Sequence, residues 1–100
     1  EQYMKHLLLE KLLNKYKLGK QPSIYYLRDK EGHEIDLVIE ENGLHLYEIK
    51  LSAMVKEDHF KNLNYFASKS DRIKSKTVIS LIDKELQISD GIKYIPYTSI

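Results

Sequence analysis

The feature that most constrains the fold is the segment GHEIDLVIEENGLHLYEIK at residues 32–50, which places charged residues inside two short apolar runs. The runs have the length and β-branched content of strands, and the Asn-Gly pair between them is typical of a hairpin turn. Because burying an unpaired charge is unfavourable, Asp36, Glu48 and Lys50 need partners within these strands. The segment therefore predicts an antiparallel hairpin whose charged side chains meet.

The length of the hairpin loop decides whether the side chains of Asp36 and Glu48 meet. A two-residue loop at 42–43 would put Asp36 and Glu48 on opposite faces of the sheet, because side chains alternate along a strand. In a three-residue loop at 41–43, Gly43 takes the left-handed position of a bulge and Asp36 lies directly opposite Glu48. We favour this register because it places the acidic side chains on one face of the hairpin and most of the apolar side chains on the other. One face then carries Glu34, Asp36, Val38, Leu46, Glu48 and Lys50, and the other carries Ile35, Leu37, Ile39, His45, Tyr47 and Ile49.

The flanking sequence predicts an α/β domain. Residues 3–18 have helical spacing of apolar side chains, at Met4, Leu7, Leu8, Leu12 and Leu13, and Gly19 follows as a stop signal. Residues 23–28 are rich in strand formers, so they add a third strand to the hairpin and complete an antiparallel meander.

The second half predicts a helix and two strands. Residues 55–68 carry a helical stripe of Phe60, Leu63, Phe66 and Ala67. After the polar stretch 69–76, which we interpret as a loop, residues 77–82 predict a buried strand parallel to a meander strand. Residues 92–97 form the last strand, and Pro96 predicts an edge position for it.

Composition limits the classes of function. The 100 residues suit one domain, and 16 basic against 15 acidic residues give no overall charge typical of a nucleic-acid binder. Cysteine is absent, which excludes disulfides and thiolate metal sites and fits the cytoplasm. Apolar runs long enough to span a bilayer are also absent, so we expect no membrane partner. The chain begins in mid-pattern without methionine, and we interpret it as a piece of a longer protein.

The paired carboxylates indicate a metal ion. Cβ atoms of opposed residues lie roughly 5 Å apart, so Asp36 and Glu48 would repel each other and one would take up a proton unless a cation lay between them. Mg²⁺ or Mn²⁺ suits such oxygen ligands. The alternative is a structural ion pair, in which Lys50 neutralises both carboxylates across the hairpin.

The pattern D-x11-E-x-K on adjacent strands resembles the PD-(D/E)XK nuclease superfamily. The longer wording, YYLRDKEGHEIDLVIE followed by LHLYEIKLS, is similar to a nuclease-like domain of unknown function at the carboxyl end of a bacterial and archaeal family of AAA-type ATPases. This resemblance implies a restriction-endonuclease-like α-β-β-β-α-β sandwich with a central mixed sheet. It also implies that residues 1–100 are a carboxyl-terminal fragment of an ATPase whose ATP site lies in the missing amino-terminal part, since the chain has no P-loop motif.

The resemblance implies roles for individual residues. Asp36, Glu48 and the backbone carbonyl of Ile49 would hold the metal, with Glu34 as an outer or second-metal contact, and Lys50 would position the attacking water. Relatives carry a glutamate in the first helix where this chain has Met4. Glu1 and Glu10 are the candidate substitutes.

Further residues are open to two interpretations. Arg28 either pairs with Glu34 or contacts a phosphate, and one of Tyr25 and Tyr26 flanks the site. The basic residues are either solvated or grip a nucleic-acid backbone; they are Lys56, Lys69, Arg72, Lys74 and Lys76. We expect no metal-binding role for the histidines. Leu9 is surplus to the helical stripe and predicts a contact with the ATPase body or a second copy.

Two functions follow from these observations. The first is metal-dependent hydrolysis of nucleic-acid phosphodiester bonds by Asp36, Glu48 and Lys50, with DNA the favoured substrate. The alternative is a catalytically inactive nuclease-fold module that binds nucleic acid or a protein partner and regulates the attached ATPase.

Overall fold

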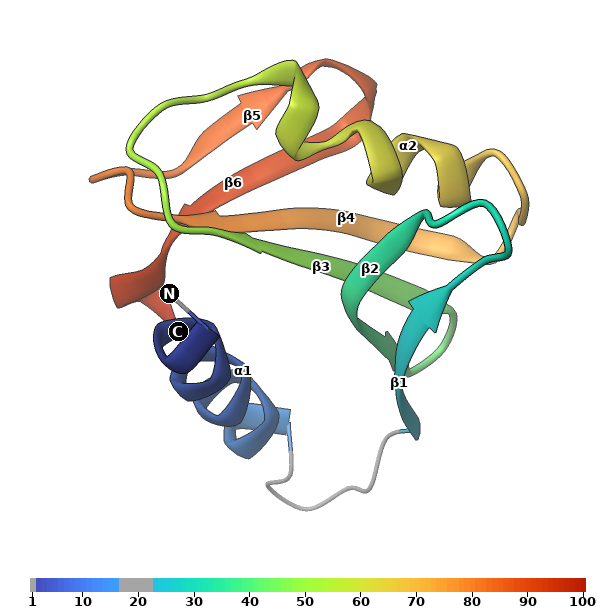
Figure 1. Cartoon of the computed structure of the whole chain (residues 1–100), viewed down its shortest axis with the longest axis horizontal. Coiled ribbons are helices and arrows are strands. Elements are labelled where there is room, and N and C mark those ends of the chain that lie inside the picture. The colour runs from blue at the N-terminus through green and yellow to red at the C-terminus, as the bar shows by residue number, and fades with distance from the viewer. Residues whose placement is uncertain (1, 17–22) are drawn as a thin grey trace.

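A mixed sheet with a helix on each face organises the chain in this computed structural model, which describes residues 2–16 and 23–100 (Figure 1). The elements in order are α1 (Gln2–Tyr16), β1 (Ser23–Arg28), β2 (Glu34–Glu40), β3 (Leu44–Lys50), η1 (Glu57–His59), α2 (Lys61–Ala67), β4 (Ile73–Ser80), β5 (Leu86–Ile88), η2 (Ser89–Gly91), β6 (Ile92–Pro96) and η3 (Tyr97–Ser99). The α/β class is confirmed.

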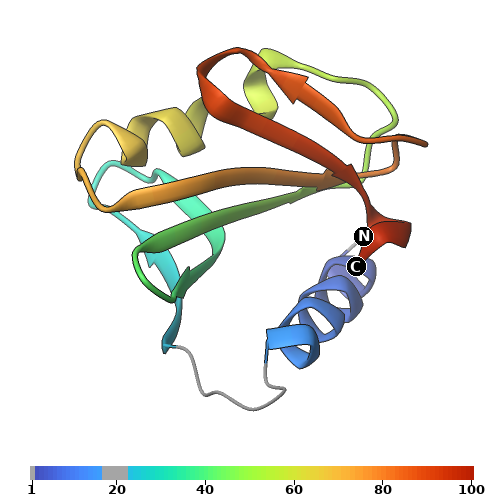
Figure 2. The same cartoon turned by 180° about the vertical axis from the view of Figure 1, so that it is seen from behind.

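Within the described ranges the sheet has six strands in the order β1-β2-β3-β4-β6-β5. The meander β1-β2-β3 is antiparallel, as predicted. β4 runs parallel to β3, which confirms the predicted parallel pairing, and β6 runs parallel to β4. The parallel crossover from β3 to β4 contains η1 and α2, which cross one face of the sheet. The view from behind shows α1 against the opposite face (Figure 2).

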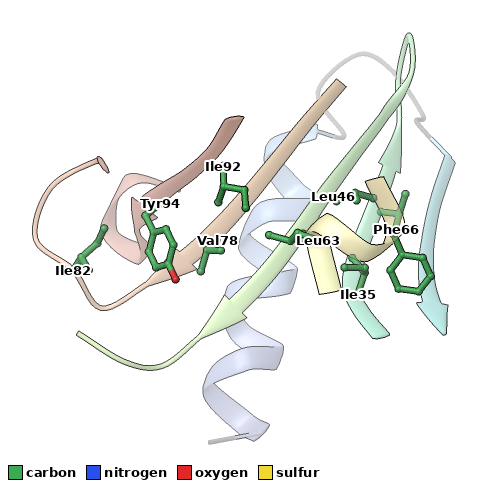
Figure 3. Packing of buried hydrophobic residues seen from close by; sticks show 9 residues of the cluster. Ile35, Leu46, Leu63, Phe66, Val78, Ile82, Ile92 and Tyr94 are labelled. Carbon is green, nitrogen blue, oxygen red and sulfur yellow. The ribbon is translucent and has the colours of Figure 1, made fainter. Parts of the chain in front are cut away.

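Each face of the sheet has its own core. The core on the α2 side is shown in Figure 3, where Leu63 and Phe66 of α2 meet the sheet residues. Its buried members are Ile35, Val38, Leu46, Leu63, Phe66, Val78, Ile82, Ile92 and Tyr94. The buried members of the core on the α1 side are Leu8, Leu12, Leu37, Ile39, Tyr47, Ile49 and Ile79. Full burial of an aliphatic side chain contributes about 1.5–3 kcal/mol, so both helices are held mainly by these contacts.

The buried stripe of α1 differs from the predicted one. Leu8 and Leu12 are buried as expected, but Leu9 packs against the same core and is not surplus. Met4 and Leu7 are instead exposed. Both sets satisfy helical spacing, and the sheet selects the set that faces it. The predicted positions 17 and 18 of this helix lie outside the described residues.

The second predicted helix is divided into two short pieces. Residues 57–59 form a 3-10 turn, Phe60 leaves helical geometry, and α2 begins at Lys61. Leu63 and Phe66 are buried and Phe60 packs against their cluster, so most of the predicted stripe faces the core. The pattern identified the apolar face correctly because both pieces contribute to it.

The strands after α2 correct three predictions. β4 begins at Ile73, because residues 73–76 pair with β3 despite their polar side chains. The prediction missed β5, whose three residues are too few for a periodic pattern. β6 lies between β4 and β5 and is therefore not an edge strand. Pro96 is tolerated because β5 pairs only with Ile92 to Tyr94, which leaves the outer side of Pro96 unpaired.

The helices of the described ranges are short or amphipathic. No helix within residues 2–16 and 23–100 has the length and apolar content needed to cross a membrane.

Candidate functional site

The β2–β3 hairpin has the predicted register. Leu37 pairs with Tyr47 and Glu40 with Leu44, which corresponds to a three-residue loop at 41–43 and confirms the favoured alternative. Asn42 takes the left-handed conformation with φ 56°, whereas Gly43 has φ 123°. The left-handed position therefore belongs to Asn42, and Gly43 supplies a second positive φ that other residues rarely adopt.

Beyond the Leu37–Tyr47 pair, β2 and β3 are joined by hydrogen bonds from backbone amides to carboxylates. The Asp36 amide donates to Glu48 Oε1 over 2.9 Å, and the Ile49 amide donates to Asp36 Oδ2 over 2.9 Å. We call this arrangement of Asp36, Glu48 and the Ile49 backbone the acidic seam. Since each carboxylate bonds the opposite strand, the two acidic side chains are held in one gap between β2 and β3.

A bulge in β2 makes the predicted sorting of faces wrong. Tyr25 pairs with Val38 but Leu27 pairs with Ile35, so two β2 residues, Asp36 and Leu37, lie opposite Tyr26 alone. A bulge of this kind shifts the alternation of side chains. Ile35 consequently joins the core on the α2 side and not that of Leu37.

The bulge also separates the sides from which the carboxylates enter the seam. Asp36 reaches the α1 side, where Lys5 Nζ lies 3.6 Å from Oδ2. Glu48 pairs in parallel register with Val78, a member of the core on the α2 side. The two carboxylates therefore do not stand together on one face, as the register alone predicts. They enter the same gap from opposite sides of the sheet.

Glu48 is the most perturbed acid of the seam. Its side chain is 4% exposed. Burial, and then the charge of Asp36, raise the pKa of Glu48 to about 7. Lys50 Nζ lies 3.5 Å from Glu48 Oε2 and acts in the opposite direction, but it does not offset the burial. The predicted competition between two close carboxylates is thus present, with Glu48 as the group that holds a proton near neutral pH.

Among the described side chains of α1, Lys5 and not a glutamate contacts the seam. Met4 is exposed, and Glu10 pairs with His6 over 3.0 Å at the surface of the helix. Glu1 lies outside the described residues. Sequence reasoning missed Lys5 because its contact with Asp36 depends on how α1 packs against the sheet. A lysine one residue after the position expected for a glutamate does not by itself indicate such a contact.

Two of the flanking predictions concern β1 and β2. Arg28 Nε lies 3.4 Å from Glu34 Oε1, so Arg28 forms the predicted ion pair. Glu34 also accepts a hydrogen bond from Tyr26, and that bond raises the pKa of Tyr26. Tyr26, and not Tyr25, is the tyrosine beside the site, because Tyr26 lines a cavity with Glu34 and Asp36.

The predicted basic residues are not gathered at the acidic seam. Arg72 pairs with Glu40, Lys74 packs over Gly43, and Lys76 Nζ donates to Asn64 Oδ1 over 3.1 Å. Lys69 Nζ lies 5.0 Å from the ring centre of Tyr65. Lys56 is exposed in the segment before η1. These partners account for most of the basic residues as parts of the fold.

The turn before β2 holds a second cluster that sequence reasoning missed. Ligand atoms of Asp29, Glu31 and His33 lie within 4.8 Å of one another. Burial acts to raise the pKa of Asp29, but hydrogen bonds from Tyr65 and His33 outweigh it and lower the pKa to about 2. Asp29 Oδ1 accepts hydrogen bonds from the backbone amides of Glu31 and His33, so this cluster stabilises the turn between β1 and β2.

The donor atoms of the acidic seam fit a hard divalent cation. Two carboxylates and the Ile49 carbonyl are all oxygen ligands, the type that Mg²⁺ and Mn²⁺ prefer. Burial, and after it the charge of Asp36, raise the pKa of Glu48, so its ionised form is disfavoured in the seam. A cation bound between the carboxylates would stabilise the ionised form of Glu48.

Comparison with known proteins gives one family. A family model described as a domain of unknown function, DUF4143, matches residues 2–100. Neither the curated proteins nor the solved structures contain a match to the chain.

Proposed function

Because the chain belongs to the DUF4143 family, whose description names no activity, we propose a function from the acidic seam: metal-dependent hydrolysis of nucleic-acid phosphodiester bonds. The observation that carries the proposal is the convergence of Asp36 and Glu48 in one gap, each bonded to the opposite strand. The proposal includes a PD-(D/E)XK nuclease-like fold and, in the full-length protein, attachment to an AAA-type ATPase. The order of helices and strands in the meander and crossover supports this fold.

The residues of the seam divide the work between them. Asp36, Glu48 and the Ile49 carbonyl would hold Mg²⁺ or Mn²⁺, with Glu34 as an outer contact. The cation supplies a Lewis acid and lowers the pKa of bound water. Lys50 places its ammonium beside Glu48 and would stabilise negative charge that develops on the phosphate. The turn residues of the hairpin hold the register that brings these groups together.

A second candidate function rests on Lys5. This lysine contacts Asp36 while Lys50 contacts Glu48, so each carboxylate has a cation of its own on its own side of the sheet. Such pairing supports an inactive nuclease-fold module, in which the seam is structural and the domain binds nucleic acid or a protein partner that regulates the ATPase.

A Mn²⁺ titration of the Asp36→Asn variant tests the first candidate. We expect the wild type to bind about one ion per chain and Asp36→Asn to bind at least about ten-fold more weakly. Asparagine keeps an oxygen for the Ile49 amide, so the fold is preserved, which circular dichroism checks. Asp83→Asn removes an exposed carboxylate elsewhere and is the matched control. If Asp36→Asn and Asp83→Asn bind as tightly as the wild type, the metal site is not in the seam.

Lys5→Gln separates the two candidates. If Asp36 is a metal ligand, Lys5 competes with the cation, and its removal should tighten Mn²⁺ binding roughly five-fold, the equivalent of about 1 kcal/mol for a partly exposed ion pair. Lys11→Gln removes an exposed lysine of the same helix as a control. A Lys5→Gln variant that is less stable and still binds no Mn²⁺ would favour the structural ion pairs of the second candidate.

A further inference from the structure

A cavity of about 540 Å³ opens beside Asp36, between α1 and the first two strands. We call it the Tyr26 cavity. Its lining residues are Lys5, His6, Leu9, Tyr26, Glu34 and Asp36. Cavities of roughly 300–1,000 Å³ hold drug-sized ligands, the size class of a single nucleotide. The volume is too small for a nucleic-acid duplex.

Tyr26 provides an aromatic wall for this cavity. Its side chain is 57% exposed, which is high for a large aromatic residue in a strand. The hydroxyl group is bonded to Glu34, so one end of the ring is anchored. Tyr25, the preceding residue, lines a separate apolar cavity with Phe66 and Leu46. The two tyrosines therefore face different environments, and Tyr26 alone is beside the acidic seam.

The polar residues of the cavity match the other parts of a nucleotide. Lys5 and Asp36 both line the cavity, with Lys5 Nζ 3.6 Å from Asp36 Oδ2, and this ammonium can contact a phosphate oxygen. Glu34 presents a carboxylate that can accept a hydrogen bond from an N–H group of a base, such as N3–H of thymine or uracil. Leu9 adds an apolar surface beneath. The cavity thus offers a cation, an aromatic ring and an acceptor within one nucleotide's volume.

We propose that the Tyr26 cavity binds single-stranded nucleic acid by stacking one unpaired base on Tyr26, with the adjoining phosphate at Lys5. This inference rests on the proposed function, because it takes nucleic acid as the ligand. It adds that the bound strand is single-stranded. A base within a duplex is already stacked and paired, so its face is closed to a side chain. An unpaired base can leave the stack and lie on the tyrosine. The phosphate next to it then points to the acidic seam.

Fluorescence anisotropy with labelled (dT)10, r(U)10 and a ten-base-pair duplex tests the proposal, in Ca²⁺ and again in EDTA. We expect one of the single strands to bind more tightly than the duplex, and Tyr26→Ala to weaken that binding roughly ten-fold, since stacking on an aromatic ring contributes about 1–3 kcal/mol per base. Tyr26→Phe keeps the ring and should bind within about two-fold of the wild type. Tyr25→Ala is the matched control and should also bind like the wild type.

Three results would overturn the proposal: no binding of either single strand, tighter binding of the duplex, or equal effects of Tyr26→Ala and Tyr25→Ala. Circular dichroism of each variant excludes loss of folding as the cause. The Mn²⁺ titration is independent of these results. A chain that binds no Mn²⁺ at Asp36 but keeps Tyr26-dependent binding in EDTA would refute the nuclease proposal and retain the Tyr26 cavity. A chain that binds Mn²⁺ at Asp36 but shows no Tyr26-dependent binding of a single strand would retain the nuclease proposal and refute the Tyr26 cavity.

Discussion

Replacing Glu48 by glutamine should make the domain more stable at pH 8 and much less so at pH 5. The pKa of Glu48 is about 7 in the folded chain, against an ordinary value of 4.5 for an exposed glutamate. The folded state therefore holds more protons than the unfolded state between these values, and the free energy of unfolding falls as pH rises through this window. A shift of this size corresponds to about 3 kcal/mol, which the neutral glutamine avoids.

Urea unfolding of the wild type and Glu48→Gln at pH 5, 6, 7 and 8 measures this effect. The difference between the two proteins removes contributions that both share, such as that of His59, whose pKa is lowered by burial and acts in the opposite sense. Glu85→Gln, at an exposed position, is the control and should give parallel curves. Parallel curves for Glu48→Gln as well would mean that Glu48 is ionised throughout. Mn²⁺ added at pH 8 should stabilise the wild type and not Glu48→Gln, if the seam is a metal site.

Replacing Gly43 by alanine should be the more damaging of two glycine substitutions in turns. Gly43 has φ 123°, and a Cβ there would overlap Cγ of Lys74 and lie 3.1 Å from the Arg72 carbonyl oxygen. Gly32 also has a positive φ, but a Cβ there would meet nothing within 4 Å. Backbone strain is common to both sites, whereas the overlap is specific to Gly43. We expect losses of about 2–3 kcal/mol for Gly43→Ala and about 1 kcal/mol for Gly32→Ala.

Urea unfolding at one pH compares these two variants directly. The hairpin could escape the overlap by slipping to a two-residue loop, but Asp36 would then no longer lie opposite Glu48. Mn²⁺ binding should therefore weaken in Gly43→Ala and stay unchanged in Gly32→Ala. Equal stability losses in the two variants would show that the loop accommodates a side chain beside Lys74.

The sequence predicted the parts of the fold that depend on side-chain pattern. The hairpin register followed from the alternation of Leu37 and Ile39 with charged neighbours and from the residues of the turn, and the structure has that register. The meander and the parallel β4 were predicted for the same reason. In contrast, residues 73–76 and β5 are strands because a neighbouring strand offers backbone partners. The polar side chains of these residues do not indicate that their backbones pair with a neighbouring strand.

The candidate site could be predicted only in part. Asp36, Glu48 and Lys50 stand out in the sequence because they are charges within apolar runs, but the side of the sheet from which each enters depends on the bulge opposite Tyr26. Turn residues at 29–32 predict that β1 and β2 form a hairpin, but they do not reveal the change of register that makes the bulge. Lys5 and the Tyr26 cavity depend in turn on the docking of α1. These features arise from tertiary contacts and not from local pattern.

The carboxylates of the seam make the continuity of the sheet dependent on charge. β1 and the outer part of β2 are joined to β3 by four residue pairs, from Leu37–Tyr47 to Glu40–Leu44, and past Leu37 the joint consists of side-chain oxygens bound to amides. Ordinary backbone carbonyls neither titrate nor change partners, whereas carboxylates do both. A proton or cation that binds Asp36 or Glu48 would therefore compete with the hydrogen bonds that join β2 to β3 beyond Leu37.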